Sequence, residues 1–332
     1  MNSTPSPAAP QGGEGSSRTQ ASWAATRERG ALFTMWLMFH TVKLLSGPLA
    51  MPFVYLSTAY FFVVSRRARA ASRDYLARVA AAAPDRGVNA RPLTVYRHFL
   101  SFARAIVDKQ DAWLGRIDYS KVGIEDHARM RVMAQGSRGV LLIGSHLGNL
   151  ELCRALATLN RRVRLNVLVH TRHSKSFNQV LRMAGATQVE LLQVTDLSAA
   201  TALMLKSRVD QGEWVVIAGD RVPVHGGRTV DVQLLGAPAP MPVGPYVLAS
   251  VLECPVHLLF CLRRPTGYRV FFEPFCTQVR WQRSQRDAII ADLAQRFAAR
   301  LEHYLLMEPL QWFNFYPFWR SEAPARDANG TT

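Results

Sequence analysis

Short apolar runs separated by helical patterns constrain the fold of this chain most. The runs are four or five residues long and each is followed by polar or small residues; they are Val140–Ile143, Leu165–Val169 and Trp214–Ala218. Runs of this kind are typical of buried parallel strands. Helical patterns lie between them, at Leu150–Leu159, Ser176–Met183 and Ser198–Gln211. The alternation predicts an α/β fold, with a mixed, mostly parallel sheet flanked by helices.

Other patterns extend this sheet and its helices. Val256–Leu262 and Arg269–Phe272 are apolar runs separated by a Pro- and Gly-containing turn, which predicts a hairpin at the end of the sheet. Ala288–Leu305 repeats apolar residues at helical spacing, and so do Ser72–Ala83 and Leu93–Val107 before the sheet. We therefore expect helices on both sides of the strand-forming region.

A long apolar segment precedes these helices. Leu44–Val64 is 21 residues without a charged side chain, and as a helix it would be about 30 Å long, enough to cross a bilayer. Pro48 and Pro52 interrupt it, and arginines flank both of its ends, which favours a broken helical anchor that dips into one leaflet. The alternative is a buried helical hairpin. If the segment spans the membrane, its heavier C-terminal basic flank places the following domain in the cytoplasm.

Composition narrows the class of protein. The chain has 40 Lys and Arg against 24 Asp and Glu, a net charge of +16 that attracts polyanions: nucleic acid, anionic lipid or an acidic carrier protein. The aromatic and basic residues match no RNA-binding motif, so nucleic acid is disfavoured. The cysteines lie within or beside apolar runs without a C-x-x-C pair, and we interpret them as reduced core residues. No metal site or cofactor is predicted.

The segment that carries most chemical information is Gly144-Ser-His146-Leu-Gly148-Asn149-Leu-Glu151, which follows a predicted strand directly. On one helix, residues five apart point about 140° away from each other. His146 and Glu151 therefore meet only if His146 lies in the turn before the helix, with Gly148 allowing the backbone to fold back. The carboxylate would then orient the imidazole as a general base, without a protein nucleophile. Alternatively, His146 is a turn histidine and Glu151 a carboxylate at a helix start.

The chain resembles the lysophospholipid and lipid A acyltransferase superfamily, and within it the predicted bacterial acyltransferases close to the lipid A late acyltransferases. The resemblance covers about Arg27 to Trp319. Besides the His-x4-Asp/Glu string, it rests on three segments, namely Ile217–Pro223, Leu234–Pro245 and the aromatic Trp312–Trp319. Together with the composition and the apolar segment, it predicts four parts: a disordered tail over 1–26, a membrane-anchoring helical segment over 27–66, an acyltransferase domain over 67–320 and a disordered tail over 321–332.

The resemblance implies roles for the matched residues around the dyad. His146 would take the proton of an acceptor hydroxyl, and Glu151 would stabilise the imidazolium. Backbone amides at Gly148 and Asn149 would bind the oxyanion of the tetrahedral intermediate.

The acceptor side is expected to use residues after two later strands. Arg221 would grip a phosphate, with Asp220 holding Arg221 or a sugar hydroxyl; the alternative for this pair is a structural ion pair. Arg172 and Asn178 are weaker candidates for the acceptor pocket. The form Asp220-Arg-Val-Pro223 departs from the usual lipid A acyltransferase string, which puts a phosphorylated disaccharide acceptor in doubt.

These observations predict a membrane-associated O-acyltransferase at the cytoplasmic face of the inner membrane. Its acyl donor would be acyl carrier protein or acyl-CoA, and its acceptor a hydroxyl of a lipid A-like glycolipid or another lipid. The positive charge would serve carrier docking and approach to an anionic membrane surface. The alternatives are a catalytically silent lipid- or carrier-binding protein of the same fold and an acyl thioesterase. The aromatic ending is either core packing or an interfacial belt.

Overall fold

The computed structural model describes residues 51–113, 116–150, 163–169, 189–193, 198–222 and 227–319. The chain divides into two compact units, Met1–Leu56 and Ser57–Thr332. The second unit contains the sheet and the candidate site, and it is the unit described below. Both predicted tails and the segment before Met51 lie outside the described residues.

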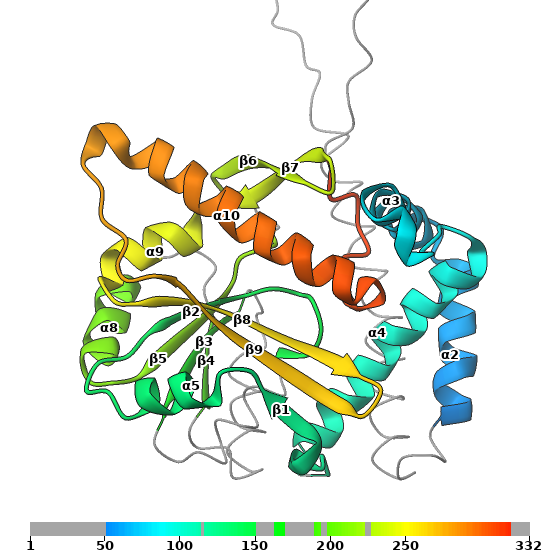
Figure 1. Ribbon diagram of the computed structural model, residues 1–332, viewed down its shortest axis with the longest axis horizontal. Helices are drawn as coiled ribbons and strands as arrows, with labels where there is room; N and C mark the ends of the chain where they lie inside the picture. The colour runs from blue at the N-terminus through cyan, green and yellow to red at the C-terminus, as the bar shows by residue number, and fades with distance from the viewer. Residues whose placement is uncertain are drawn as a thin grey trace, which may run out of the picture. The chain divides into compact units, whose positions relative to one another are not determined.

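A seven-stranded sheet forms the centre of the second unit (Figure 1). Its strands are β1 (Val122–Ile124), β2 (Leu141–Gly144), β3 (Leu165–Val169), β4 (Val189–Gln193), β5 (Trp214–Ala218), β8 (Val256–Arg264) and β9 (Gly267–Cys276). The order is β1-β9-β8-β2-β5-β3-β4. Only the β8–β9 hairpin pairs antiparallel. The predicted α/β class, the three buried strands and the hairpin are confirmed, whereas β1 and β4 were not predicted.

Alternate residues of the central strands point into two separate cores. In β2, Leu141 and Ile143 join the larger core, while Leu142 joins the smaller one. In β5, Val215 and Val216 divide in the same way. Because side chains of a strand alternate between its faces, a strand covered on both sides reads as a continuous apolar run. This is the physical reason that β2 and β5 were recognisable in the sequence.

Helices cover both faces of this sheet (Figure 1). The helices are α3 (Arg66–Ala82), α4 (Pro92–Trp113), α5 (His127–Ala134), α8 (Ala199–Asp210), α9 (Gly244–Leu252) and α10 (Arg286–Met307). The larger core takes buried side chains from all of them except α5, whose methionines pack against the smaller core. The helices predicted before the sheet, after β4 and near the C-terminus are confirmed.

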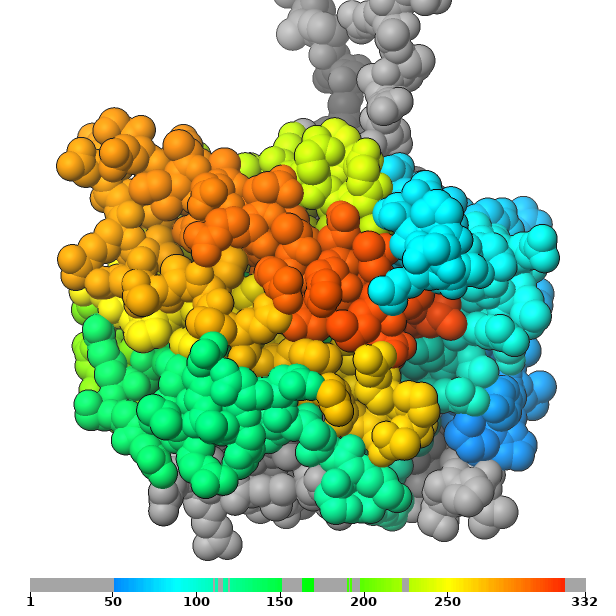
Figure 2. All heavy atoms as spheres, viewed as in Figure 1, coloured from blue at the N-terminus to red at the C-terminus, as the bar shows by residue number. Residues whose placement is uncertain are grey.

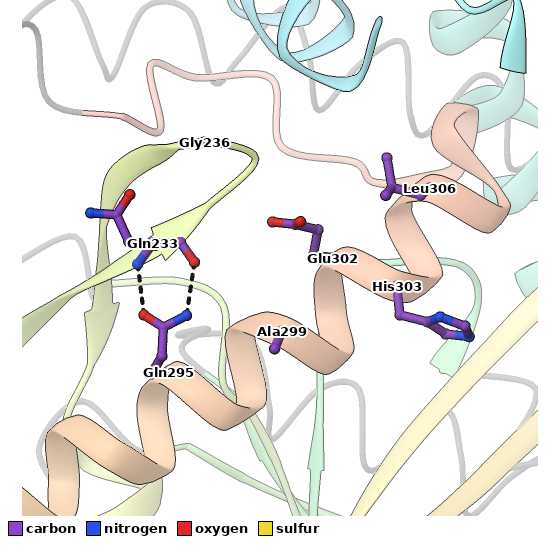
Figure 3. A pocket seen from close by; sticks show the side chains of 7 residues that line it. All are labelled: Gln233, Gly236, Gln295, Ala299, Glu302, His303 and Leu306. Carbon is purple, nitrogen blue, oxygen red and sulfur yellow. Dashed lines mark hydrogen bonds between the residues drawn. The ribbon is translucent and has the colours of Figure 1, made fainter. Parts of the chain in front are cut away.

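A small hairpin is attached to α10 rather than to the main sheet. It consists of β6 (Thr229–Leu234) and β7 (Ala237–Pro242), joined through Leu235 and Gly236, which both have positive φ. The side chain of Gln295 pairs with the backbone N–H and C=O of Gln233 (Figure 3). Glu302 accepts from the N–H of Leu235 at 2.6 Å. The residues Gln233, Gln295 and Glu302 line a shallow hollow of about 410 Å³ between the hairpin and α10.

The apolar segment is described from Met51 onward as helix α2 (Met51–Val64), which crosses the boundary between the two units. Within the second unit, Phe62 packs edge-on against Tyr96 and Phe99 of α4. Tyr60 and Val63, in contrast, are more than half exposed. In the described part of the chain, no helix is both long and apolar enough to cross a membrane.

The C-terminal segment lies against the first helices of the second unit (Figure 2). The hydroxyl of Tyr75 in α3 donates to the carbonyl of Pro309 at 2.9 Å, and the Tyr75 ring contacts that of Trp312. The aromatic ending is mostly buried, which confirms that it forms core packing. Helices far earlier in the sequence are therefore part of the support for this segment.

Candidate active site

Two neighbouring parallel strands place the central pair of polar side chains. Gly144, the last residue of β2, is in register with Ala218, the last residue of β5. His146 and Asp220 each follow two residues after these strand ends, and the Gly219 amide donates to the Gly144 carbonyl at 2.8 Å. The carboxyl ends of parallel strands form one edge of the sheet, where α/β proteins place their ligand sites. The equal spacing therefore brings the imidazole and the carboxylate to the same level.

His146 and Asp220 are joined by two hydrogen bonds. The ring Nδ1 of His146 lies 2.8 Å from Oδ1 of Asp220, and the backbone N–H of His146 donates to Oδ2 at 2.8 Å. An ionised carboxylate only accepts, so Nδ1 carries the proton and Nε2 is the basic nitrogen. The His146 side chain is 34% exposed, while that of Asp220 is fully buried. The buried carboxylate therefore holds the imidazole through Nδ1 and leaves Nε2 available as a general base.

The carboxylate of Asp220 is kept ionised by its neighbours. Burial alone would raise the pKa of the Asp220 carboxyl, but the adjacent His146 ring and the hydrogen bonds from His146 and Trp312 outweigh it. The pKa of Asp220 consequently lies below its usual range. A charged Asp220 stabilises the protonated form of His146, which is the form produced when the imidazole takes a proton.

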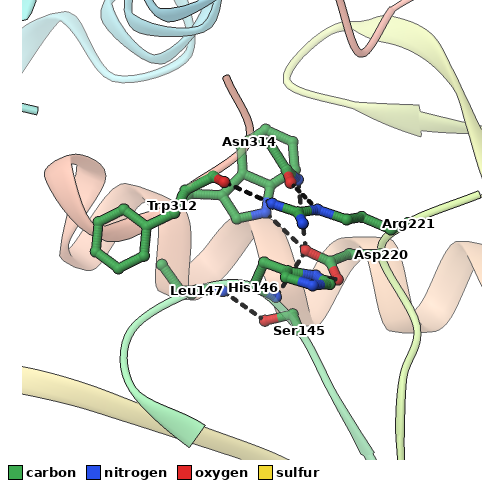
Figure 4. Close-up of polar contacts among 8 residues, drawn as sticks. Ser145, His146, Leu147, Asp220, Arg221, Trp312 and Asn314 are labelled. Atoms are coloured by element: carbon green, nitrogen blue, oxygen red, sulfur yellow. Dashed lines mark hydrogen bonds and ion pairs between the residues drawn. The ribbon is translucent and has the colours of Figure 1, made fainter. Parts of the chain in front are cut away.

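Two residues of the aromatic ending complete the contacts to this carboxylate (Figure 4). The indole Nε1 of Trp312 donates to Oδ2 of Asp220 at 2.9 Å, and Nδ2 of Asn314 lies 3.5 Å from the same oxygen. Both side chains are buried. Sequence reasoning missed these contacts, since no local pattern links a C-terminal segment to the end of β5.

The predicted role of Asp220 is corrected by this geometry. We expected it to hold Arg221 or a sugar hydroxyl, but it is fully buried and holds His146. Arg221 instead donates through Nε to Oδ1 of Asn314 and through Nη2 to the carbonyl of Phe313, both at 2.6 Å. One edge of the guanidinium suited to bidentate binding, formed by Nε and Nη2, is therefore engaged inside the protein. Arg221 anchors the aromatic segment beside His146.

The turn after His146 is fixed by backbone pairing to distant segments. The N–H of Gly148 donates to the carbonyl of Gln311, and the N–H of Asn149 donates to the carbonyl of Cys261, both at 2.8 Å. Gly148 has φ +73°, and a Cβ there would lie 1.9 Å from the Cys261 carbonyl oxygen, so only glycine fits. The expectation that these two amides bind the oxyanion is wrong, because both are already paired.

The side chain of Asn149 remains a candidate for contact with substrate. It is 6% exposed, and its Nδ2 is buried without a hydrogen-bond partner. Buried donors are rarely left unpaired in proteins, and this one lies three residues after the candidate base in the sequence.

Three predicted site residues, Glu151, Arg172 and Asn178, lie outside the described residues. The orienting position that we predicted for Glu151 is occupied, at Nδ1 of His146, by Asp220. The signal that could have identified Asp220 is its position two residues after a buried strand, matching that of His146. Using this signal requires knowing that β5, and not β3, lies next to β2 on the side away from β8.

No group of three or more His, Cys, Asp or Glu side chains suited to a metal ion occurs among the residues that the structure describes. Ser145 does not resemble an activated nucleophile, because it is buried and its Oγ accepts from the N–H of Leu147 at 3.2 Å. A positioned base without a protein nucleophile is suited to removing the proton from a bound hydroxyl.

The family comparison gives a match over most of the chain. Residues 30–321 match the model of the bacterial lipid A biosynthesis acyltransferase family. The matched range contains β2, β5 and the whole C-terminal aromatic segment that meets them. No match was found among curated proteins.

Proposed function

Because the chain belongs to the bacterial lipid A biosynthesis acyltransferase family and is thus an acyltransferase, we propose that it moves a fatty acyl group from a carrier thioester to a hydroxyl of a lipid or glycolipid. The observation that carries the proposal is the hydrogen bond between His146 Nδ1 and the buried Asp220, which leaves Nε2 as the base. General-base help of this kind contributes about 10²–10⁴-fold in rate.

In the proposed reaction, His146 first accepts and then returns one proton. The acceptor hydroxyl gives its proton to Nε2 of His146 as its oxygen attacks the thioester carbonyl carbon. The resulting tetrahedral oxyanion collapses, the carbon–sulfur bond breaks, and the thiolate leaves with the proton that His146 returns. Asp220 offsets the charge on the imidazolium between these steps.

Two further residues are proposed to act on the reacting groups. The unpaired Nδ2 of Asn149 is offered as a donor to the oxyanion, in place of the two backbone amides. The family motif supports a catalytic role for Glu151, while Arg172 and Asn178 are proposed for the acceptor pocket.

The proposed donor is acyl carrier protein or acyl-CoA, and the proposed place of work is the cytoplasmic face of the inner membrane. The net charge of +16 supports binding of an acidic carrier and an anionic membrane surface. Within the second unit, exposed Tyr60 and Val63 are followed within a few residues by Arg66 and Arg67. Apolar side chains next to arginines are suited to the interface of an anionic bilayer.

The test is a transfer assay with the purified full-length protein. Labelled acyl carrier protein or acyl-CoA is mixed with a lipid extract, and product lipids are followed by mass spectrometry. We expect His146→Ala to lower the transfer rate by about 10²–10⁴-fold. The matched control is His303→Ala, which removes an exposed histidine on α10 and should leave the rate unchanged.

Three outcomes would contradict the proposal. Equal rates for wild type and His146→Ala would remove His146 from the mechanism. Release of free fatty acid in the absence of any acceptor lipid would identify a thioesterase. Binding of carrier or lipid without any mass gain on a lipid would identify a silent binding protein.

A further inference from the structure

The indole N–H of Trp312 contacts Asp220 but has no role in the proton transfer proposed above. Trp312 is fully buried, and its Nε1 donates to the oxygen of Asp220 that does not contact the imidazole ring (Figure 4). An indole nitrogen can only donate. A carboxylate that accepts a hydrogen bond shares its negative charge with the donor, and so attracts the opposing imidazolium less strongly.

The main chain of Trp312 is also held by contacts to two other segments. The carbonyl of Trp312 accepts from Nε2 of His98 at 2.8 Å, and Trp312 pairs as an isolated antiparallel bridge with Leu147. On the other side of His98, Nδ1 lies 2.8 Å from the hydroxyl of Ser72. The Tyr75 ring packs on the indole at 5.0 Å. Helices α3 and α4 thereby fix the donor that faces the catalytic carboxylate.

From this geometry we infer that Trp312 is a positioning residue, whose Nε1–H holds Asp220 and thereby sets both the orientation of His146 and the pH dependence of the proposed reaction. This inference rests on the proposed function for its kinetic test but not for its spectroscopic one.

Other groups around the pair have distinct positions. His146 comes from the turn after β2, and Arg221, from the end of β5, is engaged by Asn314 and Phe313. Tyr316, from the C-terminal segment, lies under the Arg221 guanidinium at 5.8 Å. Burial and the charge of Asp220 raise the pKa of its hydroxyl to about 12, while Arg221 opposes that shift. His98, behind Trp312, has a pKa lowered to about 4 by burial. Near neutral pH, Tyr316 and His98 are therefore uncharged.

The variant that tests the inference is Trp312→Phe, and the chain offers a matched control in Trp319→Phe. Trp319 is also buried, and its Nε1 also donates one hydrogen bond, but to the backbone carbonyl of Leu234 at 3.1 Å. Both changes remove one buried indole N–H and leave an aromatic ring. Only Trp312→Phe removes a donor from the catalytic carboxylate.

We expect Trp312→Phe to lower kcat by about tenfold to a hundredfold with little change in KM, as loss of a hydrogen bond to a charged group predicts. The acid limb of its pH–rate profile should move to higher pH, because a less neutralised Asp220 holds the imidazolium more tightly. Trp319→Phe should leave the limb in place. Equal behaviour of the two variants, with neither limb displaced, would overturn the inference.

A second measurement needs no substrate and no folded Trp312 variant. In full-length protein carrying 15N-labelled tryptophan, the Trp312 Nε1–H resonance should shift with pH in the wild type. That shift should vanish in His146→Ala, while the Trp319 resonance stays constant in both. A Trp312 resonance with the same pH dependence in wild type and in His146→Ala would contradict the inference even if acyl transfer is confirmed. A coupled resonance in a protein without acyl transfer would keep the inference and reject the proposed function.

Discussion

His146 and His98 show how two histidines in one unit acquire opposite properties from their surroundings. Both rings are held by hydrogen bonds, and both touch Trp312 or its partner Asp220. His98 is fully buried, with Nε2 donating to a carbonyl and Nδ1 facing a serine hydroxyl. His146 faces a buried carboxylate through one nitrogen and is about one third exposed.

The difference lies in the charge of the partner and in access to solvent. Burial lowers the pKa of His98 to about 4, with the bond to the Trp312 carbonyl opposing that shift, so the ring stays neutral and serves as a fixed bracket. At His146 a carboxylate stabilises the protonated ring, and the side chain is open to a substrate. A histidine can act as a base when its protonated form is stabilised and its free ring nitrogen is accessible to the substrate.

Asp220→Asn should change the properties of His146 more than any other variant. The backbone N–H of His146 and the indole of Trp312 both donate to Oδ2, so the amide oxygen of an asparagine must take that place. Its NH2 group then faces Nδ1 and forces the imidazole proton onto Nε2, which abolishes the base. We expect the transfer rate to fall by about 10²–10⁴-fold.

Asp287→Asn is the control for this change, since Asp287 is 78% exposed on α10 and pairs only with Arg228 among the contacts described. Its transfer rate should match that of wild type. A fully active Asp220→Asn protein would show that the carboxylate does not orient His146.

His98→Gln tests whether the buried His98 is held in its neutral form. Glutamine keeps a donor for the Trp312 carbonyl but does not titrate. Because the pKa of His98 is lowered to about 4 in the folded state, the unfolded chain binds an extra proton between about pH 6.5 and pH 4. The stability that His98 contributes is therefore complete above pH 6.5 and is lost as the pH falls through that window.

The wild type should lose on the order of 2 kcal/mol more unfolding free energy than His98→Gln between pH 7 and pH 5. Denaturant unfolding at the two pH values measures this difference. His303→Gln, at an exposed site on α10, serves as the control and should follow the wild type. Parallel pH curves for wild type and His98→Gln would show that His98 is not held neutral.

Ser72→Ala is expected to have the smallest effect. It removes the hydroxyl beside Nδ1 of His98 and leaves a buried acceptor unpaired, at a cost of about 1–2 kcal/mol in unfolding free energy. Ser250→Ala is the matched control, because the Ser250 hydroxyl donates to the Val247 carbonyl within its own helix. If the thermal unfolding midpoint of Ser72→Ala were no lower than that of Ser250→Ala, the hydrogen bond between Ser72 and His98 would not contribute to stability as proposed.

Local patterns predicted much of the sheet but only part of the site. The runs at β2 and β5 are apolar throughout because both faces are covered, and this continuity is visible in the sequence. β4 was missed, and so was β1, which has only three residues. The oxyanion prediction at Gly148 and Asn149 failed because the partners of those amides, Gln311 and Cys261, are distant in sequence.

The α/β class, the acyltransferase family and the position of His146 after a buried strand were predictable from the chain, since each depends on residues close together in it. The carboxylate that contacts Nδ1 of His146 could be identified only from the fold. Asp220 lies 74 residues further on, and Trp312 a further 92. Strand order and the packing of the aromatic segment bring them together, and neither leaves a periodic trace in the sequence.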